Sequence, residues 1–333
     1  MTSAATGQVG NRVTGPAGRS ALEGHRRELT GYCYRMLGSA FDAEDAVQET
    51  MLRAWRGVDR FDGRSSLRTW LYRIAHHVCL DQLSSRRRRA LPVDLGSPSA
   101  PVETALGGPR SDQGWIGPAP DRSVLPDVGD PADLALARES VRLAFVAALQ
   151  HLPPRQRAVL ILRDVLRWQA TEVAGLLDDS VASVNSALQR ARATMAGRSA
   201  ADGTTPDDLD PAHRRLLDRY VASFERYDID TLVSLLREDA THCMPPYRMW
   251  LRGATDIGRW MLGPGRGCRG SRLLRVSANG GPAFAQYRPD PAGGYRPFSI
   301  QLPTVSGDRI SGFTHFLDTR LFPLFGLPPH LEP

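Results

Sequence analysis

Three things are scarce or missing in this sequence of 333 residues: lysine, paired cysteines and long hydrophobic runs. All 42 basic residues are arginine, a bias that indicates a GC-rich coding sequence rather than a function. The four cysteines stand far apart, which argues against a disulfide framework or a zinc site and favours a reducing cytoplasm. No run approaches the roughly 18 apolar residues of a membrane span, so we expect no membrane contact.

What is present bounds the class of protein. A net charge of +6 suits a polyanionic partner without proving one. The length predicts about two or three domains, and an apolar fraction of 41% is enough for ordinary globular cores. Residues 1–21 lack the apolar segment of a signal peptide, and we expect them to form a disordered leader.

Composition divides the rest of the chain into three structured blocks and two linkers. We expect helices in 22–90 and in 131–198, joined by a linker at 91–130 that is rich in Pro, Gly, Ser and Asp and has little apolar surface to bury. A second linker at 199–210 precedes block 211–333, where two helical stretches come before five candidate strands: His242–Met244, Leu273–Ala278, Ala283–Tyr287, Pro297–Leu302 and Ile310–Phe316. The expected fold class is multidomain, two all-α domains followed by an α+β domain.

The segment DAEDAVQETMLRAWR, residues 42–56, has the spacing of an amphipathic helix. Its core-facing arc holds Ala43, Ala46, Val47, Thr50, Met51, Ala54 and Trp55. The opposite face presents Asp45, Gln48, Glu49, Leu52 and Arg56. Because carboxylates repel phosphates, this face favours a protein partner with a basic surface rather than nucleic acid.

The stretch LPPRQRAVLILRDVLRWQATEVAGLLDDSVASVNSALQRARATM predicts a helix-turn-helix. Pro153–Pro154 suits a helix start, and Asp179 or Ser180 suits the cap of the last helix. That helix presents Ala182, Ser183, Asn185, Ser186, Gln189, Arg190 and Arg192 on its outer face. In a major groove Asn, Gln and Arg read base edges and Ser bonds phosphate. The alternative is a plain helical hairpin with a solvated face.

A second candidate surface lies in FDGRSSLRTWLYRIAHHVCLDQLSSRRRR. Its inward stripe is Leu67, Trp70, Leu71, Ile74, Ala75, Val78 and Cys79. We expect Thr69, Tyr72, Arg73 and His76 to face outward, with His77 at the margin. Exposed aromatic and Arg side chains suit unpaired bases, and the run Arg86–Arg89 adds affinity for phosphates. The alternative is ordinary solvated surface, and adjacent histidines point apart, so no metal site is expected.

These segments resemble the sigma-70 family, in its short extracytoplasmic-function (ECF) group. The segment from DAEDAVQETMLRAWR to HHVCLDQL resembles region 2, and the helix-turn-helix stretch resembles region 4, together over roughly residues 22–198. The resemblance implies a promoter-specificity subunit of bacterial RNA polymerase. Its implied partners are core RNA polymerase, through the β′ clamp helices and the β subunit, and promoter DNA. Whether an anti-sigma protein also binds is left open.

The resemblance also implies roles for individual residues. In the family the acidic helix docks on the β′ clamp helices, at positions matched by Asp45, Gln48, Glu49 and Arg53. The loop Val58–Arg64 and the next helix melt and read the −10 element, which implies as contacts Arg64, Arg68, Tyr72, Arg73, His76 and His77. The helix Val181–Ala193 reads the −35 element. The family often has Asn at the position of His77.

Residues 211–333 resemble the SnoaL-like fold, a cone of helices on a curved sheet, through their helix-strand order and MPPYRMWLRGATDIGRWM. This implies an extension that tunes the sigma factor in cis. Six residues could line a pocket, namely His242, His315, Tyr247, Trp250, Trp260 and Tyr287, but no catalytic constellation stands out. We therefore expect no catalytic residue, cofactor or metal. Two rivals stay open: a freestanding helix-turn-helix regulator, and a DNA-binding module fused to a small-molecule enzyme.

Overall fold

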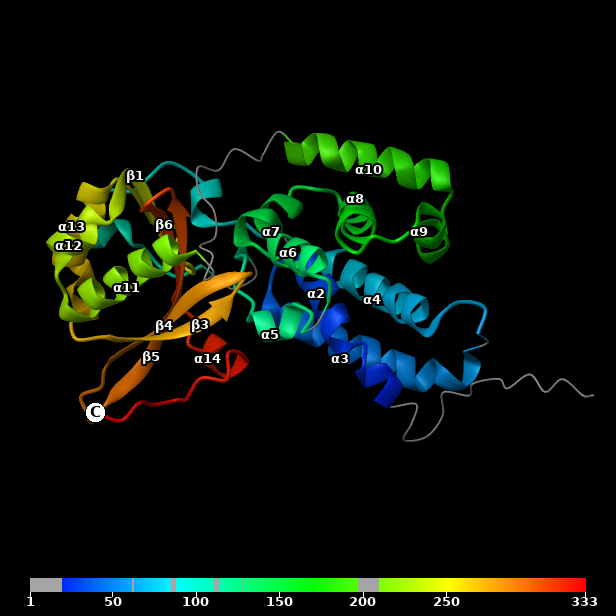
Figure 1. The fold of residues 1–333 in the computed structure, drawn as a ribbon, viewed down its shortest axis with the longest axis horizontal. Coiled ribbons are helices and arrows are strands. Elements are labelled where there is room, and N and C mark those ends of the chain that lie inside the picture. The colour runs from blue at the N-terminus through cyan, green and yellow to red at the C-terminus, as the bar shows by residue number, and fades with distance from the viewer. Residues whose placement is uncertain (1–19, 62, 85–87, 111–113, 128, 197–209) are drawn as a thin grey trace, which may run out of the picture.

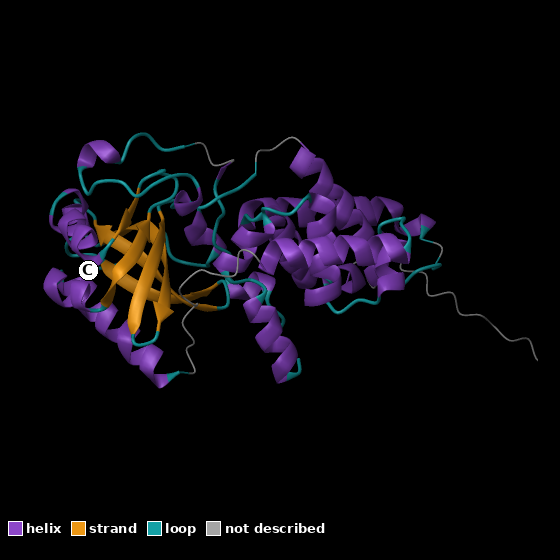
Figure 2. Ribbon diagram, turned by 90° about the horizontal axis from the view of Figure 1, so that it is seen from above, coloured by secondary structure: helices purple, strands orange, loops and turns teal. Residues whose placement is uncertain are grey.

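The computed structural model describes residues 20–61, 63–84, 88–110, 114–127, 129–196 and 210–333. A helical half and an α+β half lie side by side (Figure 1, Figure 2). The expected leader 1–21 and second linker 199–210 fall almost entirely outside the described residues, as do Arg86 and Arg87. The observed fold class is the expected one, helical domains followed by a helix-and-sheet domain.

The helical half is built from amphipathic helices whose apolar stripes meet in one core. The helices are α2 (Arg26–Leu37), α3 (Ala40–Gly57), α4 (Leu67–Ser84), α6 (Pro131–Glu139), α7 (Leu143–Leu149), α8 (Pro154–Leu160), α9 (Ala170–Leu176) and α10 (Val181–Ala196), with the 3-10 turn η1 (Val58–Arg60) and the π-helical turn η5 (Ile161–Val165). Leu29 of α2, Leu71 of α4 and Leu160 of α8 are buried in the same cluster. The two helical blocks therefore pack against each other.

The linker between the two helical blocks, residues 91–130, contacts both halves of the molecule. It contains η2 (Pro92–Asp94), η3 (Glu103–Ala105) and α5 (Asp121–Val124). The amide of Ser99 donates to the carbonyl of Trp250 at 2.8 Å, and that of Arg110 donates to the carbonyl of Pro246 at 2.9 Å. Trp115 is only 5% exposed. The expectation that this linker buries little apolar surface is wrong, because its few apolar side chains pack where the two halves meet.

The α+β half is a six-stranded sheet in the order β2-β1-β6-β5-β4-β3, antiparallel except where β1 pairs with β6. Its strands are β1 (Leu236–Cys243), β2 (Trp250–Arg252), β3 (Arg272–Ala278), β4 (Gly281–Pro289), β5 (Tyr295–Ser306) and β6 (Arg309–Phe316). Its helices are α11 (Pro211–Arg226), α12 (Ile229–Ser234), α13 (Ala254–Leu262), the turn η6 (Pro264–Cys268) and α14 (Leu321–Leu324). The five expected strands fall in β1 and β3 to β6, while β2 and α13 were not foreseen.

Each face of the sheet has its own hydrophobic cluster. Helices α11 to α13 pack on one face, around Tyr220 and Phe313. The other face packs on α14 and reaches Phe41 and Leu143 of the helical half. The face that carries the second cluster therefore meets the helical half, which lies beside the sheet in the view from above (Figure 2).

Candidate functional site

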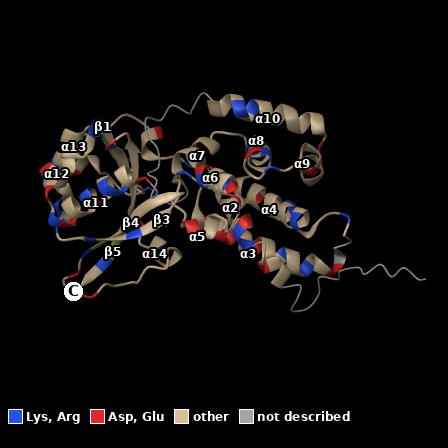
Figure 3. Cartoon of the chain, in the orientation of Figure 1, with Lys and Arg blue, Asp and Glu red and all other residues tan. Residues whose placement is uncertain are grey.

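The outward face of α3 is open to solvent. Asp45, Gln48 and Arg53 are exposed, and Glu49 is half-buried. Arg53 donates to Glu49 at 2.7 Å and to Asp81 at 3.4 Å, so these charges are oriented by one another. Along α3 the acidic residues Asp45 and Glu49 precede the basic residues Arg53 and Arg56, and Figure 3 marks charged positions of both signs on the helices of this half.

Two apolar side chains extend the same surface. Leu52 is 46% exposed, as expected, but Trp55 is 54% exposed although its spacing placed it on the core-facing arc. The expectation for Trp55 was wrong: Ala54 and Gly57 turn the last part of α3 towards the core and Trp70, whereas Trp55 lies beside Leu52 on the open side of the helix. The exposed face of α3 thus combines charge with apolar surface, as protein interfaces do.

The expected outward face of α4 is largely covered. Tyr72 is fully buried, and its ring lies 5.3 Å from Tyr32 and 4.9 Å from Trp168, centroid to centroid. His76 is 6% exposed and hydrogen-bonds through Nδ1 to the Tyr32 hydroxyl at 3.0 Å. Burial, followed by the charge of His77, lowers the pKa of His76 to about 4, so its ring is neutral near pH 7. The prediction that Tyr72 and His76 face solvent is wrong, since α4 is packed on more than one side.

The cover over α4 comes from the helix-turn-helix. The Arg68 guanidinium lies 4.9 Å from the Trp168 ring centroid. Arg73 donates to the carbonyl of Gly175 and lies 3.7 Å from a carboxylate oxygen of Asp178. These residues flank or belong to α9. Of the residues expected to face promoter DNA on α4 and the loop before it, only Arg64 and His77 are exposed here, and Arg68 and Arg73 are half-buried.

Helix α10 presents its expected outer face. Ala182, Asn185, Ser186, Gln189, Arg190 and Arg192 are exposed, and Ser183 is half-buried. The Ser180 hydroxyl accepts from the amide of Ser183 at 3.2 Å and so caps the helix, one of the two expected caps. Arg192 pairs with Asp164 through two hydrogen bonds of 2.6 and 2.9 Å, which braces α10 against η5. The remaining amide, hydroxyl and guanidinium groups form a surface suited to a major groove.

The turn between β3 and β4 contacts the linker and both helical blocks. Its Asn279 accepts from the amide of Ala119 at 3.0 Å through Oδ1. Through Nδ2 it donates to the Tyr34 hydroxyl at 2.6 Å and to the carbonyl of Val141 at 2.7 Å. Asn279 and Gly280 both have positive φ, 53° and 81°, as a two-residue type I′ turn requires. Sequence reasoning missed this contact, and the Asn-Gly dipeptide is the signal that marks the turn.

The six pocket candidates of the α+β half do not converge. The rings of His242 and His315 lie 4.4 Å apart between centroids, tilted by 52°, and both are buried on the helix-covered face. Tyr287 lies in the opposite cluster and donates to the carbonyl of Pro328 at 2.8 Å. The Trp250 indole donates to the carbonyl of Gly96 in the linker at 3.0 Å.

The helix-covered face of the sheet holds a polar network instead of a cluster of those candidates. Tyr220 donates to Gln301 at 2.7 Å, and Gln301 donates to Gln286 at 2.9 Å. Burial lowers the pKa of His242 to about 4, and burial together with His242 holds the pKa of His315 well below its usual range. Within the described ranges, no three His, Cys, Asp or Glu side chains gather to form a metal site.

Comparison with known proteins agrees with this arrangement. Residues 21–89 match the Sigma-70 region 2 family, and residues 142–195 match the Sigma-70, region 4 family. The chain is 50% identical over 314 residues to the ECF RNA polymerase sigma factor SigG of Mycobacterium tuberculosis, covering 93% of this chain and 83% of that protein. It is 32% identical over 250 residues to SigJ of the same organism, covering 73% and 72%.

A solved structure has the same fold over nearly its full length. The crystal structure of the Mycobacterium tuberculosis extracytoplasmic function sigma factor SigJ superposes with a TM-score of 0.59 at 24% identity, covering 93% of this chain and 99% of that one. In the part of this chain that the structure describes, no helix is both long and apolar enough to cross a membrane.

Proposed function

Because the chain belongs to the ECF group of the sigma-70 family, whose members bind core RNA polymerase and promoter DNA, we propose that its SnoaL-like domain controls promoter recognition in cis. The chain itself directs promoter-specific transcription initiation. The proposed control is inhibitory: residues 211–333 favour a closed arrangement in which region 4 covers the −10 face of region 2.

One observation carries the proposal. Trp168 stacks on Tyr72, and the residues that follow α9 pair with Arg73. Regions 2 and 4 must reach separate promoter elements at the same time. In the closed arrangement α4 is occupied by region 4, so the two elements are not available to DNA together. The β3–β4 turn, which contacts region 2 and the segment before region 4 through Asn279, is suited to hold this arrangement.

The closed arrangement leaves the polymerase-facing surface free. We assign core binding to Asp45, Gln48, Glu49 and Arg53, with Leu52 and Trp55 as apolar neighbours. All of these side chains are exposed except Glu49, which is half-buried, so polymerase can bind α3 before region 4 leaves α4. In this proposal polymerase binding precedes opening of the sigma factor.

When region 4 moves away from region 2, the face of α4 becomes available to promoter DNA. We assign −10 recognition to Arg64, Arg68, Arg73 and His77, and to Tyr72 once Trp168 has moved away. His76 is left out, because its partner, the Tyr32 hydroxyl, belongs to region 2, whereas Tyr72 is covered in part by Trp168, which opening removes. We assign −35 recognition to the outer face of α10, through Ala182, Ser183, Asn185, Ser186, Gln189 and Arg190, with Arg192 positioning the helix through Asp164.

No chemistry is assigned to the SnoaL-like domain. Its buried Tyr220, Gln301 and Gln286 satisfy one another, and the paired histidines are held neutral by burial. We propose that this domain acts through contacts alone and that the protein works in the cytoplasm, where its polymerase is found.

The test is run-off transcription with core polymerase. The full chain is compared with a chain that ends after Ala201, at equal concentrations and across several promoters and salt concentrations. We expect higher output from the shorter chain. Equal output under all conditions contradicts control in cis and reopens the enzyme alternative for residues 211–333.

A further inference from the structure

A cavity lies between regions 2 and 4, separate from the surfaces described so far. Its volume is about 380 Å³, within the range of small-molecule sites. Region 2 contributes Leu83, Arg88 and Arg89, which follow or end α4, and region 4 contributes His151, Pro153 and Arg157. The cavity exists only while the two regions are packed together.

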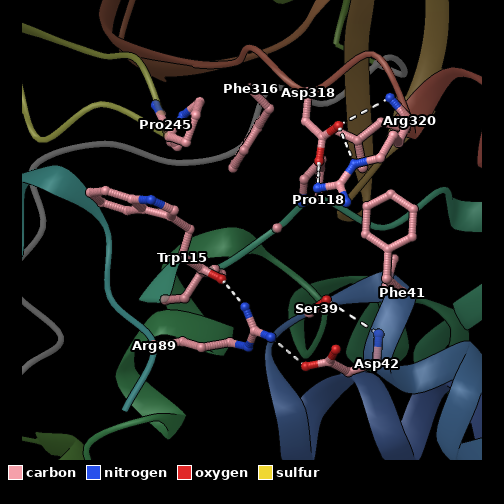
Figure 4. Close-up of a pocket in the computed structure, with 15 residues that line it drawn as sticks. Ser39, Phe41, Asp42, Arg89, Trp115, Pro118, Pro245, Phe316, Asp318 and Arg320 are labelled. Carbon is pink, nitrogen blue, oxygen red and sulfur yellow. Dashed lines mark hydrogen bonds and ion pairs between the residues drawn. The ribbon is translucent and has the colours of Figure 1, made fainter. Parts of the chain in front are cut away.

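The charges that line this cavity do not cancel. Arg89 pairs with Asp42 and also donates to the carbonyl of Trp115, as Figure 4 shows from the neighbouring side. Asp42 is the one carboxylate among the lining residues. Arg88 and Arg157 therefore leave an excess of two positive charges around the cavity.

Arg157 is an unusual buried cation. Its side chain is 4% exposed, and its nitrogens donate to neutral oxygens, the carbonyl of Met36, the backbone and side chain of Gln150, and the carbonyl of Leu152. Its Nε has no hydrogen-bond partner among the described atoms. Burial lowers its pKa to about 10, which reflects the cost of holding this charge away from water. A nearby anion would offset that cost.

Arg88 faces the cavity from the other wall. It is exposed and donates to Nδ1 of His151 at 2.8 Å, so the His151 ring acts as an acceptor there. A guanidinium has five N–H groups in a planar fork, which leaves further donors of Arg88 for a ligand. Forked donors of this kind match the oxygens of a phosphate group.

We propose that this cavity binds a nucleotide through its phosphate groups. The terminal N–H groups of Arg157 are taken by neutral oxygens, so Arg157 contributes charge to the cavity while Arg88 contributes donors. Two positive charges without a lining carboxylate suit a di- or triphosphate, whose charge exceeds what one arginine neutralises. The apolar walls, including Leu83 and Pro153, suit the less polar body of such a ligand. A carboxylate metabolite carries less negative charge than a di- or triphosphate. An uncharged apolar ligand would leave the charges of both arginines without a counter-charge.

The location of the cavity determines which arrangement of regions 2 and 4 the ligand would stabilise. A nucleotide held between Arg88 and Arg157 touches region 2 and region 4 together, so it binds the closed arrangement and stabilises it by mass action. This consequence for transcription rests on the proposed inhibitory role of the closed arrangement. Binding itself does not, because it is measured on the free chain.

The experiment is calorimetric titration of the full-length chain with ADP, pyrophosphate and adenosine at low salt. We expect saturable binding of ADP and, at similar or weaker affinity, of pyrophosphate, and none of adenosine. Arg88→Ala is expected to weaken ADP binding about tenfold, the loss of roughly one charge-assisted hydrogen bond. Arg259→Ala removes the same charge from exposed α13 and is the matched control, expected to bind as the parent does. Arg157 is buried, so its replacement can unfold the chain and is not used.

Three binding results overturn the site. Adenosine binding as tightly as ADP contradicts the phosphate anchor, and equal affinity of the Arg88→Ala and Arg259→Ala chains contradicts the location. Absence of saturable binding by ADP and pyrophosphate, with promoter DNA binding that depends on Arg88, assigns these arginines to DNA instead. If ADP binds as expected while truncation after Ala201 leaves transcription unchanged, the site stands and the inhibitory role fails.

Discussion

Replacing Asn279 by glycine should release the closed arrangement. Glycine keeps the positive φ of this position, and Gly-Gly is a favoured pair for a type I′ turn, so the hairpin of β3 and β4 is retained. What disappears is the side chain that contacts Ala119, Tyr34 and Val141. Asn279→Asp is the companion variant, because it keeps the acceptor for Ala119, loses the two donations and places a buried carboxylate against the carbonyl of Val141.

The size of the effect follows from the bonds removed. A neutral hydrogen bond contributes about 0.5 to 1.5 kcal/mol net, so loss of three bonds at Asn279 should weaken the closed arrangement by about 2 to 4 kcal/mol. Since 1.4 kcal/mol corresponds to a factor of ten, the balance between closed and open chains should move about 30-fold to 700-fold. Asn279→Asp should move it in the same direction by at least as large a factor, because a buried carboxylate oxygen would face the carbonyl oxygen of Val141.

Two measurements check this. Run-off transcription at limiting sigma factor should rise for both variants, and small-angle scattering should report a larger radius of gyration for the free chain. Thermal unfolding serves as the control for general damage to the SnoaL-like domain. If both variants match the parent in output and in radius while remaining folded, the β3–β4 turn does not hold the regions together, and the reasoning from Asn279 is refuted.

Three further predictions concern other parts of the molecule. Gln48→Ala combined with Glu49→Ala should weaken binding to core polymerase in a pull-down, because both side chains lie on the exposed face of α3; unchanged capture of a folded variant would contradict that assignment. Arg190→Ala should cost about 1 to 3 kcal/mol of −35 affinity if it reads a base, whereas a loss that is equal across scrambled sequences would make Arg190 a phosphate contact. The pKa of His242 is lowered to about 4 and that of His315 lies well below its usual range, so both rings resist protonation in the folded domain. Stability is therefore highest above about pH 6.5, the unfolded value, and falls as the pH drops below it, over a window that for His242 ends near pH 4. Urea unfolding should therefore show a falling midpoint across that window, with a shallower fall for His242→Phe, and a midpoint independent of pH would refute it.

The sequence predicted the buried face of a helix well where that helix packs on one side only. The stripe Ala43, Ala46, Val47 and Thr50 of α3 is buried as its period predicts, and the outer face of α10 is exposed as expected. The helical period of apolar residues identifies one buried face of a helix and gives no sign of a second. It therefore failed at Tyr72, which α2 packs from one direction and Trp168 from another.

Long-range contacts were beyond the same reasoning. The Asn-Gly pair at 279–280 indicates a tight turn, but nothing local indicates that the turn contacts Tyr34, far earlier in the chain. The linker was misjudged for a related reason. Low apolar content predicts little burial on average, yet single residues such as Trp115 and Ile116 fit between surfaces that the sequence alone does not bring together.

The hydrogen bonds between the linker and the SnoaL-like domain have a mechanical consequence. The linker's attachments at Gly96, Ser99, Arg110 and Ala119 are spaced along the chain rather than stacked side by side. When regions 2 and 4 are drawn towards their two promoter elements, tension reaches these attachments one after another, as in peeling a strip from a surface. We expect these attachments to release in sequence, so that the span between the DNA-binding regions lengthens in steps.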